Sequence, residues 1–140
     1  IMAVIGGEIE IKTKKENQII NITPEVEDII LKSGLKDGLV CIFVGGSTGA
    51  ITTMEFEPGL LEDVPEALER IAPKKSEYQH HLRWNDGNGH SHVKAALMGP
   101  GITIPFRNCQ PVVGTWQQIV FIELDVKPRE RRIIVQMIGE

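Results

Sequence analysis

The chain has 140 residues, of which 41% are hydrophobic and 24% are charged, as in an ordinary soluble globular protein. Its formal charge of −4 argues against a nucleic acid as the main partner, because that affinity rests on basic surface. No apolar run is long enough to cross a bilayer, and no basic leader precedes one, so we expect a cytoplasmic protein without a membrane partner. The length suits a single domain spanning residues 1–140.

The first third of the chain predicts two strands and a helix. Apolar and charged residues alternate over 8–13, which is typical of a strand with one solvated face. A second short strand over 18–22 follows a charged turn, so the two strands are expected to form a hairpin. A helix then begins at Thr23 and Pro24, since proline fits the first helical turn, and it ends at Gly34, which accepts the left-handed cap conformation.

A continuous apolar run over 39–44 predicts a central strand that is buried on both faces, with Cys41 as a buried thiol. The run ends in a turn rich in glycine, and an alternating strand over 51–57 follows. Two interpretations of the turn stay open. Its backbone N–H groups, together with Ser47 and Thr48, bind an anion, or the turn is an ordinary tight hairpin, which is the commoner case.

The remainder predicts further helices and antiparallel strands. Helical spacing of apolar residues ends before Pro73, and a short helix-like segment covers 93–98. Strands are expected over 102–106, 109–113, 115–126 and 131–139. Pro105 and Pro111 each lack a ladder donor, so the strands that contain them belong at a sheet edge or carry bulges. We therefore predict an α+β fold, with an antiparallel β-sandwich-like core and two or three helices.

The stretch from Tyr78 to His92 contains every histidine of the chain: His80, His81, His90 and His92. Imidazole is the commonest metal ligand and titrates near neutral pH, so this stretch is the first candidate for a functional site. In an extended segment His90 and His92 would point to the same side. With His80 folded back by the intervening turn, three imidazoles would hold a divalent ion such as zinc. The alternative is that each histidine is a solvated or hydrogen-bonded loop residue.

Other polar residues could complete a site. Arg107 has the shape to hold a phosphate or carboxylate, although a solvated charge explains it equally well. Asn88 joins Ser47 and Thr48 as a ligand-binding candidate, although its position also suits a simple turn. The chain has no phosphate-binding Walker loop, no G-x-G-x-x-G, no C-x-x-C and no H-E-x-x-H motif.

Several spaced motifs resemble the YjbQ-like family, which is commonly labelled the secondary thiamine-phosphate synthase enzyme family. They are Tyr78-x-His80, Asp86-Gly-Asn-Gly89, His92-Val-Lys-Ala95, Gly99-Pro-x-x-x-x-Pro105 and Gly114-Thr-Trp-Gln117. The resemblance runs from Glu8 to Glu140 and fits an archaeal-type variant. It implies an α+β fold with a β-sandwich-like core, a homotrimer, and a site built around histidines where zinc or a similar metal binds.

One departure concerns the turn after the central strand. Many family members carry Pro-His-Thr-Thr there, whereas this chain reads Gly45-Gly46-Ser47-Thr48, so the family histidine is missing at Gly46. His90 stands where many members have an acidic residue, so it is expected to compensate for the missing group.

The resemblance implies an enzyme acting on a small phosphorylated ligand. Its reaction would join a pyrimidine diphosphate to a thiazole phosphate, in the manner of a thiamine-phosphate synthase. His80 and His92 would act as metal ligands or proton-transfer groups, with His90 as an auxiliary ligand. Arg107, with Ser47 and Thr48, would hold the phosphate. The alternative is a non-catalytic trimer that binds a metal or a small ligand.

Overall fold

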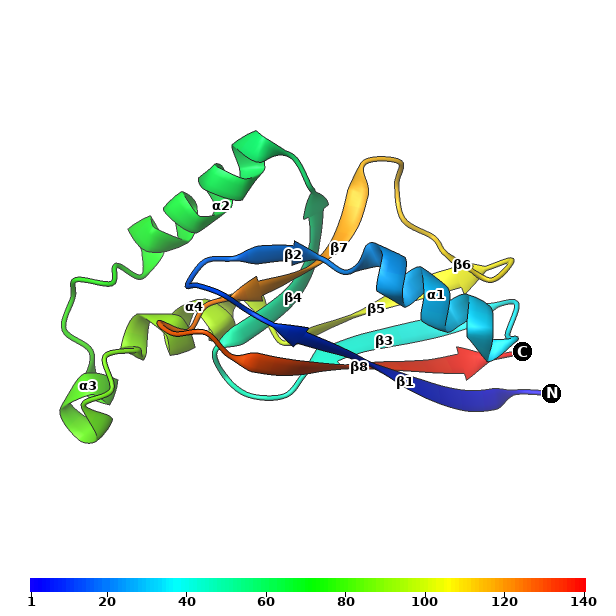
Figure 1. Ribbon diagram of the computed structural model, residues 1–140, viewed down its shortest axis with the longest axis horizontal. Helices are drawn as coiled ribbons and strands as arrows, with labels where there is room; N and C mark the ends of the chain where they lie inside the picture. Colours follow the sequence, from blue (N-terminus) through cyan, green and yellow to red (C-terminus); the bar gives the residue numbers. More distant parts are fainter.

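The computed structural model describes residues 1–140 and has two antiparallel sheets and four helices (Figure 1). The larger sheet has the order β1-β8-β3-β5-β6, and the smaller one has the order β2-β7-β4. The strands are β1 (Ala3–Lys12), β2 (Ile19–Asn21), β3 (Gly38–Val44), β4 (Gly49–Glu55), β5 (Gly101–Arg107), β6 (Gln110–Pro111), β7 (Gln117–Glu123) and β8 (Glu130–Gly139). The helices are α1 (Thr23–Ser33), α2 (Pro58–Ile71), α3 (Gln79–Trp84) and α4 (Gly89–Met98). The predicted α+β class is confirmed, with four helices instead of two or three.

The smaller sheet lies between two apolar clusters. Ile51 and Phe121 face the main core, which is shared with α1 and with the inner face of the larger sheet. Ala50 and Val120 face a second cluster that includes residues of α2 and α4. Successive residues of a strand point to opposite faces, so β4 and β7 are buried on both sides where Ala50 and Ile51 pair with Ile122 and Phe121. This double burial fixes the start of β4, and with it the turn that precedes β4.

The predicted ends of α1 are confirmed. Proline stands in its first turn, and Gly34 closes it with a φ of 77° in the left-handed region. Helix α3 was not predicted, because none of its six residues is buried and its apolar spacing is short. It ends at Asn85, which also takes a positive φ, of 53°. None of the four helices is long and apolar enough to cross a membrane.

Three local predictions were wrong. Strands β1 and β2 do not form a hairpin, since β1 pairs with β8 and β2 pairs with β7. Strand β3 is central in its sheet, but its outer face is exposed at Leu39, Cys41 and Phe43, so Cys41 is not a buried thiol. The turn after β3 is not a hairpin either, because β3 and β4 belong to different sheets.

The expectation for the two prolines is confirmed. Strand β6 has only two residues and pairs with Phe106 and Arg107 alone, which leaves most of β5 at the edge of the sheet. Pro105 therefore removes no hydrogen bond that a neighbouring strand would need.

Candidate functional site

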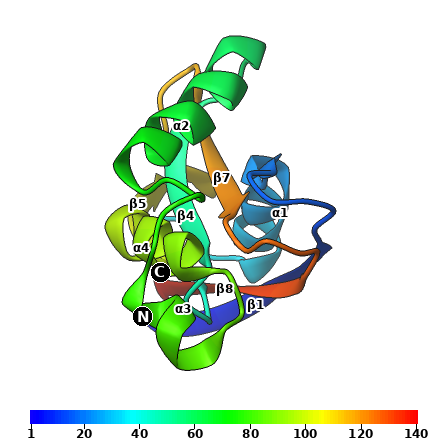
Figure 2. The same cartoon turned by 90° about the vertical axis from the view of Figure 1, so that its left-hand side faces the viewer.

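The histidine-rich stretch folds into α3, a short turn and the first turns of α4, and α3 packs against α4 (Figure 2). Helix α4 begins at Gly89, where an added Cβ would lie 2.6 Å from the Cβ of Tyr78, so only glycine allows this close approach. The expectation of an extended segment at His90 and His92 was therefore wrong. On a helix, residues two apart diverge by about 200° around the axis, so the two imidazoles point in different directions.

The structure brings His80 and His92 together. Their ring centroids lie 4.4 Å apart, with an interplanar angle of 37°. The Nδ1 atom of His80 is 3.2 Å from Oδ1 of Asp86, yet the geometry is not that of a hydrogen bond, and this buried nitrogen has no other partner. Burial lowers the pKa of His92, and the neighbouring His80 lowers it further, while Asp86 and Asp125 oppose that shift. Near neutral pH, His92 is thus held as the neutral imidazole.

His90 does not join this pair. Its ring is fully buried, and its Nε2 lies 2.7 Å from the carboxylate of Glu16 in the loop between β1 and β2. The predicted set of three histidine ligands is therefore not assembled. Nowhere in the chain do three or more His, Cys, Asp or Glu side chains lie together as a metal site requires. His81 is also structural, since its Nε2 accepts a hydrogen bond of 2.9 Å from the backbone N–H of Gly89.

Asn88 is buried between two carboxylates. One end of its amide lies 3.3 Å from Oδ1 of Asp125, and the other lies 2.8 and 3.1 Å from the two oxygens of Asp86. An amide has a donor at one end only, so in either orientation the amide oxygen faces a carboxylate. The contacts to Asp86 are the shorter ones, so Asn88 is a buried link between Asp86 and Asp125 within the candidate site.

Asp125 connects the histidine pair to the glycine-rich turn. Its buried carboxylate accepts a hydrogen bond of 3.2 Å from Oγ1 of Thr48, so Thr48 and Asn88 meet on the same side chain. Burial alone would raise the pKa of Asp125, but hydrogen bonds from Arg129, the backbone of Val126 and Asn88 lower it below its usual range. Two of the predicted ligand-binding residues are thereby placed side by side.

The other predicted anion-binding residues lie differently. Ser47 is exposed at the tip of the turn next to Thr48. Arg107 is exposed at the end of β5, where it pairs with Gln110 of β6. Figure 1 shows β6 at the opposite end of the molecule from α3. The structure thus places Arg107 away from the site.

Sequence reasoning missed Arg131, which lies beneath the turn. Its Nε donates to Glu123 at 2.9 Å, and its Nη2 donates to Oγ1 of Thr48 at 3.0 Å and also to Glu123. The signal was present in the sequence, because the alternation of β8 puts Arg131 on the same face as the buried Ile133 and Val135. A charged residue on an apolar face requires a buried partner, and Glu123 provides it.

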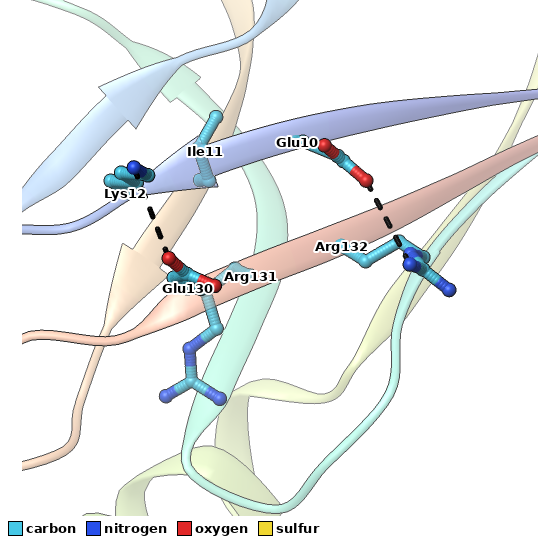
Figure 3. A pocket seen from close by; sticks show the side chains of 6 residues that line it. All are labelled: Glu10, Ile11, Lys12, Glu130, Arg131 and Arg132. Carbon is cyan, nitrogen blue, oxygen red and sulfur yellow. Dashed lines mark ion pairs between the residues drawn. The ribbon is translucent and has the colours of Figure 1, made fainter.

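A hollow of about 650 Å³ lies beside this network, between the ends of β1 and β8 (Figure 3). In its lining, Lys12 and Glu130 form an ion pair at 3.9 Å, and Glu10 and Arg132 form another at 3.7 Å. These four side chains are strongly exposed, so the pairs contribute little. Figure 3 shows the Arg131 guanidinium pointing away from both pairs. The hollow therefore does not extend the candidate site.

Comparisons with known proteins agree with this architecture. The family model described as "UPF0047 protein YjbQ-like" matches residues 7–140. A UPF0047 protein of Archaeoglobus fulgidus is 39% identical over 92% of this chain and 98% of its own. The UPF0047 protein YugU of Bacillus subtilis is 31% identical over 94% and 97% of the two chains.

Two solved structures extend the comparison to three dimensions. The crystal structure of a YbjQ-like protein of unknown function from Sulfolobus solfataricus covers all of both chains at 36% identity, with a TM-score of 0.93. An uncharacterised YjbQ/UPF0047 protein of Clostridium acetobutylicum has a TM-score of 0.81 and 36% identity, covering 92% of this chain and 98% of its own. Because the family model matches nearly the whole chain, this chain belongs to the YjbQ-like UPF0047 family.

Proposed function

We propose that the protein is an enzyme acting on a small phosphorylated ligand, with His80 and His92 as its proton-transfer groups. The observation that carries this proposal is the facing pair of imidazoles, 4.4 Å apart, with Asp86 beside one ring and a lowered pKa on the other. Two titratable groups whose environments differ in this way suit acid and base roles near neutral pH. Nearby, Thr48 and Asn88 meet on Asp125 and are positioned to orient the ligand.

The reaction that we propose for this site is of the thiamine-phosphate synthase type. A thiazole ring nitrogen forms a bond to the carbon that carries the diphosphate of the pyrimidine. The bond from that carbon to oxygen breaks, and pyrophosphate leaves with the electron pair. His80, which lies beside Asp86, donates a proton to the leaving group, while His92 stays neutral because its pKa is lowered.

Turnover of the two phosphorylated precursors tests this function, with pyrophosphate release as the readout. We expect His80→Ala and His92→Ala each to lower kcat by about a hundredfold or more, as for loss of a general acid or base. Lys32→Ala, on the exposed side of α1, is the control and should match the wild type. The proposal fails if the wild type releases no pyrophosphate above background, or if both histidine variants match it.

A second candidate function is non-catalytic binding of a divalent ion such as zinc. It is favoured by the buried, unpartnered Nδ1 of His80 and by the ring of His92 that faces it. His80 and His92 would bind the ion, with His90 left out and no third such side chain gathered with them. Zinc titration by calorimetry should give a stoichiometric site that His80→Ala weakens. Stoichiometric zinc without turnover favours this candidate, and no heat above background excludes it.

We further propose a homotrimer. The outer face of the larger sheet carries an apolar row in register across four strands, formed by Val4, Ile138, Leu39 and Pro105. The first three of these are between 45% and 63% exposed, and Phe43 lies nearby at 43%. Such contiguous exposed patches commonly mark protein interfaces. Light scattering coupled to size-exclusion chromatography should give three times the chain mass of 15.6 kDa, and a monomer mass would refute the assembly.

A further inference from the structure

We infer that the turn Gly45–Thr48, together with the guanidinium of Arg131, forms a binding subsite for a phosphoryl oxyanion. This deepens the proposed function, on which it rests for the identity of the whole ligand. It moves the cationic contact from Arg107, which lies elsewhere, to a buried arginine that is part of the network beneath the turn.

The turn offers a row of unused hydrogen-bond donors. Residues 45–48 lie between β3 and β4 and belong to neither ladder. None of their four backbone N–H groups donates a hydrogen bond within the chain, although the carbonyl of Thr48 accepts one from Leu124. Successive free N–H groups form a concave site for an anion where a residue of positive φ, as at Gly46, turns them toward one point.

The second, independent observation is the state of Arg131. Its side chain is only 9% exposed, and all of its hydrogen bonds are made by Nε and Nη2. Nη1 makes no hydrogen bond. It is not sealed from solvent either, so a ligand can reach it. Half of the guanidinium fork is therefore held rigidly by Glu123 and Thr48, while the other half keeps two donors free. A guanidinium fixed in this way loses little conformational entropy when it binds an oxyanion.

The free Nη1 faces the floor of the turn. A Cβ on Gly46 would lie 3.5 Å from it, and a Cβ on Gly49 would lie 3.6 Å from Cζ of the same guanidinium. Gly46 has a φ of 99°, which side chains rarely adopt. The glycine thus serves two purposes: it permits the conformation of the turn, and it leaves Nη1 uncovered. Residue 46 is for this reason the position that controls access to the arginine.

The charge balance indicates what the subsite can bind. Arg131 is paired with Glu123 and Arg129 with Asp125, so these four side chains carry no net charge. Attraction then depends on directed donors, which favour an anion with several oxygens. A tetrahedral phosphate offers three oxygens to the turn and to Nη1, whereas a planar carboxylate offers two. Free inorganic phosphate, lacking the rest of the ligand, should bind with a Kd of roughly 1 mM.

The first test uses the unmodified chain. In an amide ¹H–¹⁵N NMR titration with inorganic phosphate, we expect saturable shifts at the N–H groups of residues 45–48 and at Nε–H of Arg131. Sodium acetate at the same ionic strength should leave these signals nearly unchanged. The subsite is refuted if these signals do not shift saturably with phosphate, or if acetate shifts them to the same extent.

The second test uses two glycine variants with similar backbone strain. Gly46→Ala places a methyl group against Nη1, whereas Gly34→Ala adds one at a φ of 77° with no atom within 4 Å. We expect Gly46→Ala to weaken phosphate binding about tenfold or more, the cost of losing a charge-assisted hydrogen bond, and Gly34→Ala to change it less than about twofold. Equal Kd values for the two variants would overturn the role of residue 46.

The two proposals can fail separately. Phosphate shifts at the turn without turnover of the thiamine precursors would leave the subsite in place and remove the proposed reaction. Turnover without saturable shifts at residues 45–48 would keep the reaction and remove the subsite. Arg131→Lys adds a further readout, because lysine keeps the charge but lacks the fork, and we expect it to weaken phosphate binding about tenfold.

Discussion

Replacing Asp125 by asparagine should destabilise the protein, because this carboxylate links three parts of the chain. It is 1% exposed and accepts hydrogen bonds from Thr48, Asn88 and Arg129, as well as from the backbone N–H of Val126. Asparagine has nearly the same size but offers one acceptor oxygen in place of two. Its amide nitrogen must face either the guanidinium or the Val126 N–H, and both of these are donors.

The size of the effect follows from the burial of the partners. Breaking a fully buried ion pair costs about 3–5 kcal/mol. Arg129 is 40% exposed, however, so water can solvate it once its partner is gone, and the cost should fall to about 2–3 kcal/mol. With a urea slope of about 2 kcal/mol/M, the midpoint of unfolding at pH 7 should drop by about 1–1.5 M.

The matched control is Asp28→Asn. Asp28 also pairs with a cation four residues away, Lys32, at 2.8 Å, but it is 53% exposed. That substitution should cost less than about 0.5 kcal/mol. Urea unfolding followed by circular dichroism measures both variants. If Asp125→Asn and Asp28→Asn shift the midpoint equally, the carboxylate does not hold the site together as argued.

The pH dependence gives the same prediction an independent check. The pKa of Asp125 is lowered in the folded chain. The carboxylate therefore contributes its full share to the stability of the fold at pH values above the pKa of the unfolded carboxyl. The contribution is lost as the pH falls from that value through the lowered one. The gap in stability between wild type and Asp125→Asn should therefore shrink in acid. A gap that stays constant from pH 7 to acid would refute the charge-based explanation.

Three further predictions follow from single side chains. The free energy of unfolding of Lys94→Met should lie within about 1 kcal/mol of wild type, because methionine fills the buried volume without a buried charge. Lys94→Ala should lower it by about 2–4 kcal/mol, because alanine leaves a cavity. Chemical denaturation distinguishes the two variants, and equal values would contradict this explanation. In NMR titrations, His80→Ala should raise the pKa of His92, because the substitution removes the charge of His80 and lets water reach the ring. An unchanged pKa would contradict the contact between the two imidazoles. Gly49→Ala should cost about 1–3 kcal/mol in thermal unfolding, because its Cβ would lie 2.7 Å from the ring of Phe121; an unchanged Tm would contradict this contact.

The fold class could be predicted because local signals agreed with it. The alternation of apolar with charged residues indicated β1 and β8, and two prolines indicated that β5 and β6 lie at the edge of a sheet. Pairing between strands could not be predicted in the same way. Strand β2 has three residues and resembles the second strand of a hairpin with β1, but its partner β7 lies far along the chain. Such pairing is decided by the packing of the two sheets, which leaves no local mark.

The arrangement of the candidate site could be predicted only in part. Composition alone identified the region of His80 and His92, which the structure places face to face. The spacing of His90 and His92 indicated convergence only for an extended chain, and the contact of Gly89 with Tyr78 starts a helix there instead. Arg107 was chosen for its nearness in sequence, although the arginine beneath the turn comes from β8.

The position of β8 also has a consequence for how the chain folds. This strand lies between β1 and β3, with Gly139 opposite both Ala3 and Gly38. Strand β1 has no other partner in the larger sheet, so it must wait for the C-terminal strand before it can pair. Pairing between such distant segments is slow, on the order of milliseconds to seconds. During that delay β1 and β3 present open edges, and during synthesis this sheet is the part of the protein most exposed to pairing with another copy.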